Sequence, residues 1–195
     1  MWQALFILNR IVPYAKGLSN SKGDTISFTG NQPRLKALGI DYLAIVAYLA
    51  VLAAVMFAVY QLAFGAVPRF SAWQSQAIAF VTSVVPIAAY AIWRESRPPY
   101  GTFGKHRTGL MVRYNGSPLR GAVIRNAIKF LPWQLAHSAV IEGMYTGFSG
   151  WLVWLPYTIS IVLVLVLTGM VLFRRDHRHL GDMLAGAKVI IAVSR

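Results

Sequence analysis

The sequence predicts an all-α membrane protein, a bundle of four transmembrane helices with a small cytoplasmic β element. Three observations predict this class: long uncharged runs, a low content of charged residues and an uneven placement of basic ones. The chain of 195 residues is 56% hydrophobic and only 13% charged, with a mean hydropathy of +0.53. A soluble domain of this length would carry about 25% charged residues. Residues 1–195 are therefore predicted to form a single membrane domain.

The first two spans are expected over residues 35–64 and 75–93. The first begins after Pro33, a residue that is favoured at the start of a helix, and ends at Gly65. The second ends at Trp93, which is followed at once by Arg94. An aromatic residue beside a basic one is typical of the interface between membrane and water. The N-terminal segment before the first span reads as a short helix lying in that interface.

The clearest span is expected over residues 151–173, an uninterrupted run without a charged residue. A helix rises about 1.5 Å per residue, so this run is long enough to cross a hydrocarbon core of about 30 Å. Arg174, Arg175 and Arg178 follow it directly. Such a basic cluster is typical of the cytoplasmic end of a transmembrane helix.

The remaining span, over residues 122–144, is the weak one, because it contains Arg125 and Lys129. Basic residues also concentrate before the first span, in the loop 94–121 and in the tail 174–195, so all three segments are expected in the cytoplasm. A crossing by residues 122–144 is then needed to connect the loop to an external segment near Glu142. The alternative is an amphipathic helix on the inner face of the membrane. This topology also places both termini in the cytoplasm.

The β element is expected on the cytoplasmic side of the bundle. A strand-like run lies within residues 109–118 and ends at Asn115-Gly116, a strong turn signal. A second run rich in β-branched residues covers residues 187–193. The two runs are expected to pair into a small sheet that caps the helices.

The candidate site consists of ionisable residues near the membrane boundary, where an unpaired charge is costly. Arg34, Ala37 and Asp41 fall on one face of the first helix, and Ile45, Tyr48 and Leu52 continue that stripe. The stripe is therefore expected to face protein. A further carboxylate, Asp182, follows the last span on the same side of the membrane.

Other features exclude several functions. The chain has no cysteine, and His177 and His179 stand among arginines that repel cations, so we expect no metal site and no cofactor. No nucleophile motif or dinucleotide fingerprint is present, and we expect no enzyme. The basic residues do not alternate with aromatic ones as in single-strand binders, so nucleic acid is not an expected partner. Lys105 and Arg107 are expected to contact anionic lipid headgroups on the cytoplasmic face.

Three sequence blocks occur in a recognisable order: RLKALGIDYLAI, GTFGKHRTGLMV and HRHLGDMLAGAKVI. With them the chain resembles the RDD family of small bacterial membrane proteins, which is named for one arginine and two aspartates. Those residues match Arg34, Asp41 and Asp182. Ala187 stands where the family often has threonine, which removes a hydroxyl near Asp182. The resemblance implies a multi-pass protein of the bacterial inner membrane, with transport of ions or small solutes, including cation/proton antiport, as the suggested activity.

The residues leave three interpretations of this site open. Asp41 and Asp182 line a proton or cation path whose pKa values Arg34 adjusts, or Arg34 pairs with both aspartates as a structural clamp. The third interpretation is an accessory or assembly subunit of a larger membrane complex. Uncharged faces rich in small and aromatic residues suit self-association or docking to partner membrane proteins.

Overall fold

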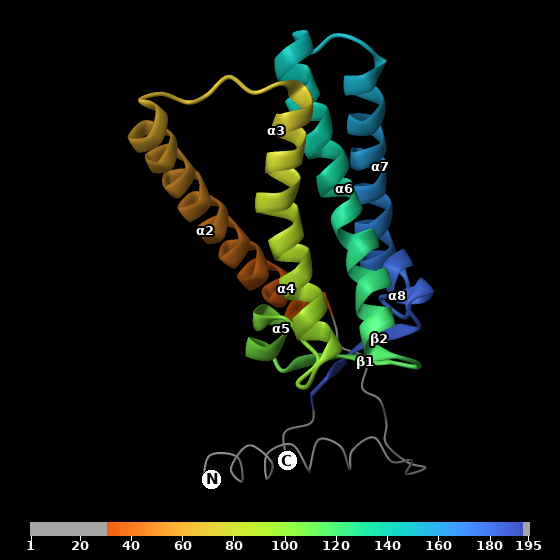
Figure 1. The fold of residues 1–195 in the computed structure, drawn as a ribbon. Coiled ribbons are helices and arrows are strands. Elements are labelled where there is room, and N and C mark those ends of the chain that lie inside the picture. Colours follow the sequence, from red (N-terminus) through yellow and green to blue (C-terminus); the bar gives the residue numbers. More distant parts are fainter. Residues whose placement is uncertain (1–30, 193–195) are drawn as a thin grey trace, which may run out of the picture.

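The computed structural model describes residues 31–192, and this range is mostly helical (Figure 1). The long helices run between two ends of the molecule. One end carries two short strands and two short helices, and we call it the sheet end. The opposite end carries the connections 65–71 and 147–150. The interfacial helix expected near the N-terminus lies outside the described residues.

The first long helix, α2 (Asn31–Phe64), begins before the expected residue 35, so Arg34 lies within its first turn. Its sheet-end half packs against the neighbouring helices through Ile45 and Leu49. Beyond this contact α2 diverges from the rest of the bundle, and its outer end stands apart from the other long helices (Figure 1). The stripe expected to face protein does so at Ile45 and at Tyr48, whose hydroxyl donates a hydrogen bond to the Thr82 carbonyl at 2.6 Å.

The second long helix combines α3 (Ala72–Ala79), a π-helical turn η1 (Phe80–Val84) and α4 (Val85–Ser96). It is longer than the expected 75–93, because Ser71 and Gln74 form a capping box that starts the helix earlier. Pro86 has no N–H to donate to the Thr82 carbonyl, and the Tyr48 hydroxyl donates to that carbonyl instead. The irregular turn thus coincides with the point where α2 is attached.

Two antiparallel helices complete the bundle, α6 (Pro118–Thr146) and α7 (Trp151–Phe173). The left-handed residue Gly147 (φ +63°) ends α6 and allows the tight connection to α7. The two helices pack along their length, and the buried Ser160 hydroxyl donates to the Pro132 carbonyl at 2.7 Å. The observed bounds of α7 coincide with the expected range 151–173.

Among residues 31–192, three helical segments are long and apolar enough to cross a membrane: Gln32–Phe64, Ala72–Ser96 and Trp151–Phe173. The helix α6 is not among them, since charged residues such as Arg125 and Lys129 and further polar residues such as Gln134 and His137 make it too polar. It nevertheless runs from the sheet end to the opposite end, between α3–α4 and α7 (Figure 1). The structure therefore supports a helical membrane protein with three candidate spans, and the fourth crossing remains a prediction.

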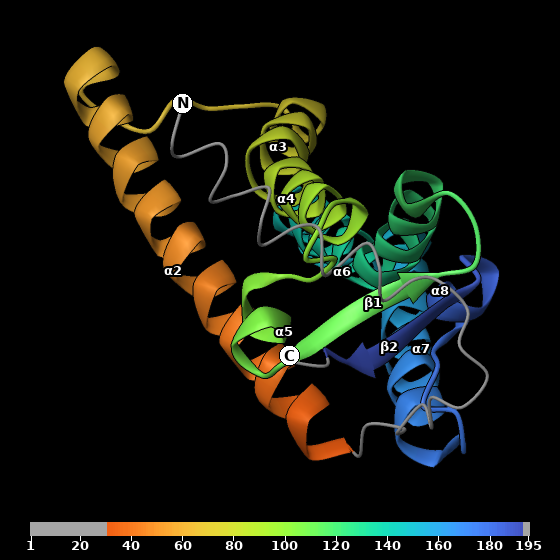
Figure 2. The ribbon, with the colours of Figure 1, turned by 90° about the horizontal axis from the view of Figure 1, so that it is seen from below.

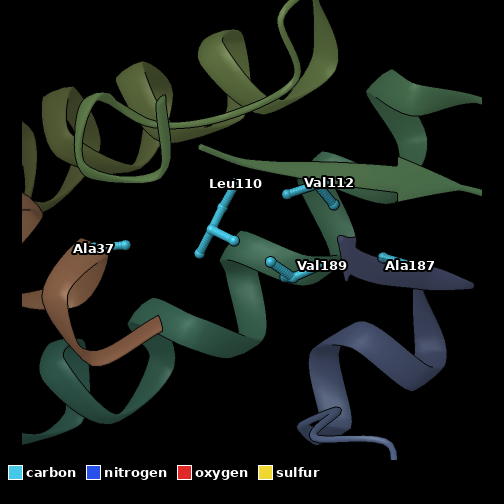
Figure 3. Close-up of a cluster of buried hydrophobic side chains, with 5 residues drawn as sticks. All are labelled: Ala37, Leu110, Val112, Ala187 and Val189. Carbon is cyan, nitrogen blue, oxygen red and sulfur yellow. The ribbon is translucent and has the colours of Figure 1, made fainter. Parts of the chain in front are cut away.

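The sheet end confirms the predicted β element. Strand β1 (Leu110–Tyr114) pairs antiparallel with β2 (Ala187–Ile191), with Val112 opposite Val189. The strands lie beside the short helices α5 (Phe103–Arg107) and α8 (Leu180–Leu184) (Figure 2). A small apolar core forms where α2 meets the sheet (Figure 3); its buried members are Ala37, Leu110, Val112, Ala187 and Val189. Asn115-Gly116 does not reverse the strand but leads into α6.

Candidate functional site

A buried network of ion pairs lies at the sheet end, with Arg125 at its centre. The Arg125 guanidinium donates through Nη1 to Glu95 Oε2 and through Nε to Asp182 Oδ1, both at 2.5 Å. Arg125 extends from α6, Glu95 from the end of α4, and Asp182 from α8. One guanidinium therefore connects three segments that lie far apart in the sequence.

Glu95 is completely buried, and each of its oxygens has a basic or amide partner. Lys105 Nζ donates to Oε1 at 2.9 Å, and Asn126 Nδ2 donates to Oε2 at 2.8 Å. A buried carboxylate is tolerated only when its desolvation is offset by such partners. Lys105, Glu95, Arg125 and Asp182 form a chain of ion pairs in which two positive side chains balance two negative ones. We call these four residues the network.

Asp182 is also part of the N-terminal cap of α8. Its carboxylate accepts a hydrogen bond from the backbone N–H of His179, and the His179 ring accepts one from the Gly181 N–H. The imidazole proton therefore resides on Nε2, which lies 3.4 Å from the Asp182 carboxylate. Burial lowers the pKa of His179 to about 4, with Arg125 adding to this effect and Asp182 opposing it. Burial would raise the pKa of Asp182, but Arg125 and His179 hold it below its ordinary value.

Asp41 belongs to a separate contact, between α2 and α5. Its carboxylate accepts hydrogen bonds from the Thr102 hydroxyl at 2.5 Å and from the Gly104 N–H at 2.7 Å. A Cβ atom added at Gly104 would lie 2.1 Å from the Ala37 carbonyl oxygen and 2.9 Å from the Asp41 carboxylate. Glycine is therefore required for α5 to approach the face of α2 closely enough for these bonds. Lys105 Nζ also donates to the Thr102 hydroxyl at 3.3 Å, which links Asp41 to the network through one side chain.

Arg34 does not form the predicted direct pair with either aspartate. Its guanidinium donates instead to two backbone carbonyls, to that of His177 at 2.5 Å and to that of Val189 at 3.0 Å. Asp182 is taken by Arg125, and Asp41 lies two helical turns along α2, where it faces α5. The three residues share the sheet end, but Arg34 attaches α2 to the segment after α7 and to β2. The clamp therefore differs in its partners from the one expected.

The two basic residues expected at lipid headgroups lie in different environments. Lys105 is buried, with 8% of its surface exposed, and its ammonium is paired with Glu95. It is therefore not available to headgroups, contrary to the expectation. Arg107 is exposed, and its guanidinium lies over the Phe103 ring at 5.1 Å, so headgroup contact by this residue remains a prediction.

Sequence reasoning missed Glu95 and Arg125, the two most connected members of the network. A signal was present, because the chain has only six acidic residues and one of them ends the second apolar run. In the sequence, Arg125 and Lys129 make residues 122–144 the weakest of the expected spans, whereas in the structure Arg125 pairs with a buried carboxylate. In the part of the chain that the structure describes, no three histidine or acidic residues gather into a metal-binding group. The Nδ1 atom of His177 lies at the Val171 carbonyl, whereas the Nδ1 atom of His179 accepts from the Gly181 N–H.

Residues 29–186 match the RDD family. This range covers most of the chain. It contains the first two sequence blocks, the third block as far as Gly186, the network and the contact between Asp41 and α5. Neither a curated protein nor a solved structure is significantly similar to the chain.

Proposed function

The chain belongs to the RDD family, and from this premise we propose that it is a non-catalytic accessory or assembly protein of a bacterial inner membrane. In this role the network and the contacts of Asp41 and Arg34 act as a structural clamp. The observation that carries the proposal is that protein groups already bond the carboxylates of Asp41, Glu95 and Asp182. A carboxylate in such a position suits a fixed fold better than a changing ion occupancy.

The proposed topology places the sheet end in the cytoplasm. Basic residues gather in the loop 94–121 and after residue 173, both at that end, as the positive-inside rule requires. The helix α6 is proposed as the additional crossing, with its polar residues shielded by α3, α4, α7 and α8. Both termini then lie in the cytoplasm.

Large apolar faces of the spans support association within the membrane. The outer half of α2 exposes Val51, Val55, Phe57 and Leu62, and α7 exposes Leu165 and Val166. Packing between such faces in lipid depends on shape and on small residues rather than on hydrophobic burial. The proposed partners are other membrane proteins or further copies of the chain, with anionic headgroups near Arg107.

The substitution Asp182→Asn tests the clamp. It leaves Arg125 with one carboxylate instead of two, and breaking a buried pair costs about 3–5 kcal/mol. We expect a lower unfolding temperature in mild detergent and loss of the proteins or copies that co-purify with the parent. Asp176→Asn is the matched control, because Asp176 pairs with Arg174 in a partly exposed bridge and should change little.

Cation- or proton-coupled transport is the second candidate, favoured by the buried carboxylate Glu95 at the sheet end of a candidate span. It requires a carboxylate that changes its protonation or ion occupancy. Asp41→Asn, which keeps the shape but cannot titrate, separates the two roles. Normal assembly together with loss of an ion-gradient-driven flux in proteoliposomes would favour transport over the clamp.

A further inference from the structure

The two-stranded sheet carries a pair of positive charges on its outer face. Strands β1 and β2 pair so that Arg113 lies directly opposite Lys188. The adjacent pair, Val112 and Val189, is buried in the small apolar core, and successive side chains of a strand point to opposite faces. Arg113 and Lys188 therefore project from the outer face, with Cβ atoms about 5 Å apart. Like charges that face one another in this way destabilise a sheet.

No carboxylate of the described residues neutralises this pair. Arg113 is exposed and Lys188 is half-buried, and among residues 31–192 neither side chain has an ion pair or a hydrogen bond. The acidic residues of this range are bonded elsewhere or lie toward the end opposite the sheet: Asp41, Glu95, Glu142, Asp176 and Asp182. A counter-charge for the pair must therefore come from outside this part of the chain.

The outer face of the sheet is turned away from the long helices. The inner face packs on Ala37 of α2. The Tyr114 ring lies against α6, where a Cβ atom added at Gly121 would lie 2.3 Å from it. Figure 2 views the molecule from the sheet end, and the strands lie in front of α6 and α7 there. A bilayer around the long helices would thus lie behind the sheet, and the outer face points toward water.

Charge argues against the chain itself as the partner of this face. Residues 1–30, which lie outside the described range, contain Arg10, Lys16 and Lys22 against one carboxylate, Asp24. A second copy would also bring more positive than negative charge, because the net charge of the chain is +13. The matching partner is therefore a different molecule, and an acidic one.

The composition of the outer face indicates which acidic molecule fits. Met111 and Ile190 form the next pair on this face, and both are half-buried. The face thus presents two positive charges beside two apolar side chains, without an aromatic ring on which a nucleic-acid base could stack. A protein segment can supply carboxylates and apolar side chains together, so it matches this face better than nucleic acid does.

We propose that the outer face of the β1–β2 sheet binds an acidic segment of a partner protein. Carboxylates of the segment pair with Arg113 and Lys188, and its apolar residues lie on Met111 and Ile190. Complementary charges of this kind steer association and select the partner. Binding also relieves the repulsion between the two basic residues. The surface lies beyond the ends of the spans, so this inference goes beyond the proposed accessory role, whose partners lie within the membrane.

The test is binding of a labelled synthetic peptide, in which glutamate alternates with leucine, to the full chain in mild detergent. Fluorescence anisotropy at low ionic strength measures the affinity. Arg113→Gln and Lys188→Gln should each weaken binding about fivefold, which corresponds to about 1 kcal/mol for one exposed ion pair. Lys36→Gln removes an exposed basic residue of α2 at the same end and should leave the affinity unchanged. A peptide with glutamine in place of glutamate should not bind.

Two further measurements separate a docking surface from a structural role of these residues. Arg113→Gln removes the repulsion within the sheet, so without peptide it should raise the unfolding temperature slightly. The double variant Arg113→Glu, Lys188→Glu should lose the glutamate peptide and bind one in which lysine alternates with leucine. Elution and helical signal check that each variant is folded.

The proposal is overturned if both glutamine variants bind the peptide as the parent does, or if the double variant does not exchange its preference. An equal loss in Lys36→Gln would show that only total charge matters, which rejects a defined site. A thymidine oligonucleotide that binds more tightly than the peptide, and is lost in the same variants, would make nucleic acid the occupant. Loss of peptide binding on transfer from phosphatidylcholine to phosphatidylglycerol nanodiscs would place the face at headgroups instead. None of these outcomes alters the test of the clamp at Asp182.

Discussion

Arg125 uses separate nitrogen atoms for two carboxylates, and this division explains why neither carboxylate is replaceable by the other. Nη1 faces Glu95 and Nε faces Asp182, so the fixed fork of the guanidinium sets the distance between α4 and α8. A lysine at this position would provide a point charge without that geometry. His179 also uses its two ring nitrogens for different partners. Its unprotonated Nδ1 caps α8, and its Nε2 faces Asp182.

The pH dependence of stability follows from His179. Its pKa is about 4 in the folded chain and about 6.5 when unfolded, so the unfolded state binds the additional proton between these values. Stability is therefore complete above pH 6.5 and falls as the pH drops toward 4. Between pH 7 and pH 5 we expect a loss of about 2 kcal/mol. Asp182, whose pKa is lowered, adds a loss only below its unfolded pKa of about 3.9.

This expectation is checked by unfolding in detergent at pH 7 and pH 5. His179→Asn retains a side chain suited to capping α8 but cannot titrate, so its stability should change much less between the two pH values. His106→Asn, at an exposed position on α5, is the control and should behave as the parent does. An equal pH response in the His179 variant and the parent would show that another group titrates.

The contact between α2 and α5 depends on close approach at a single glycine. The face of α2 that carries Ala37 and Asp41 receives α5, and Gly104 has no room for a side chain there. Further along, Ile45 and Leu49 pack against the neighbouring helices, and the Tyr48 hydroxyl is attached to the Thr82 carbonyl. Between and beyond these points α2 is largely exposed, so few contacts hold a long helix against the bundle.

Gly104→Ala should therefore be destabilising. Its Cβ would overlap the Ala37 carbonyl, and relief of such overpacking costs about 1–3 kcal/mol. Gly39→Ala is the matched control, because nothing lies within 4 Å of its added Cβ and alanine favours an exposed helix by about 0.5–1 kcal/mol. Opposite shifts of the unfolding temperature in detergent are the expected result. A neutral Gly104→Ala would mean that α5 can move away from α2 without cost.

Hydrophobic runs predict the long elements well, because length in a membrane is set by the bilayer and leaves a strong signal. The bounds of α7 show this, because the length of the uncharged run alone predicts both of its ends. The sequence predicts a second helix that is too short at both ends. Ser71 and Gln74 start the observed helix earlier, and Glu95 lies within it as a buried residue. A charged residue at the end of an apolar run is expected to be exposed to solvent only when the fold gives it no ion-pair partner. The sequence alone does not identify such a partner.

At the scale of the whole molecule, the sequence correctly predicts that Arg34, Asp41 and Asp182 lie at the same end, but it predicts the wrong contacts for Arg34. Spacing along α2 places Arg34 and Asp41 on one face, yet residues two turns apart lie about 10 Å from one another along the axis. Each therefore meets a different neighbour, β2 for Arg34 and α5 for Asp41. Which neighbour is decided by the packing of α5, α8 and the sheet, a tertiary arrangement that a single sequence does not encode locally.

The course of α6 decides the topology, and the absence of cysteine from the chain makes this testable with single cysteines. Ala66 and Ser149 are exposed positions in connections between helices, and Gly116 is an exposed position between β1 and α6. The connections 65–71 and 147–150 lie at the end opposite the sheet (Figure 1), and the connection from β1 to α6 begins at the sheet end. If α6 crosses, a membrane-impermeant maleimide should label Ala66→Cys and Ser149→Cys in intact cells. Gly116→Cys should be labelled only after permeabilisation, because the positive-inside rule places it in the cytoplasm.

If Ser149→Cys also requires permeabilisation while Ala66→Cys does not, α6 lies on the inner face of the membrane instead. Its arginine and lysine side chains then face headgroups rather than the interior of a bundle.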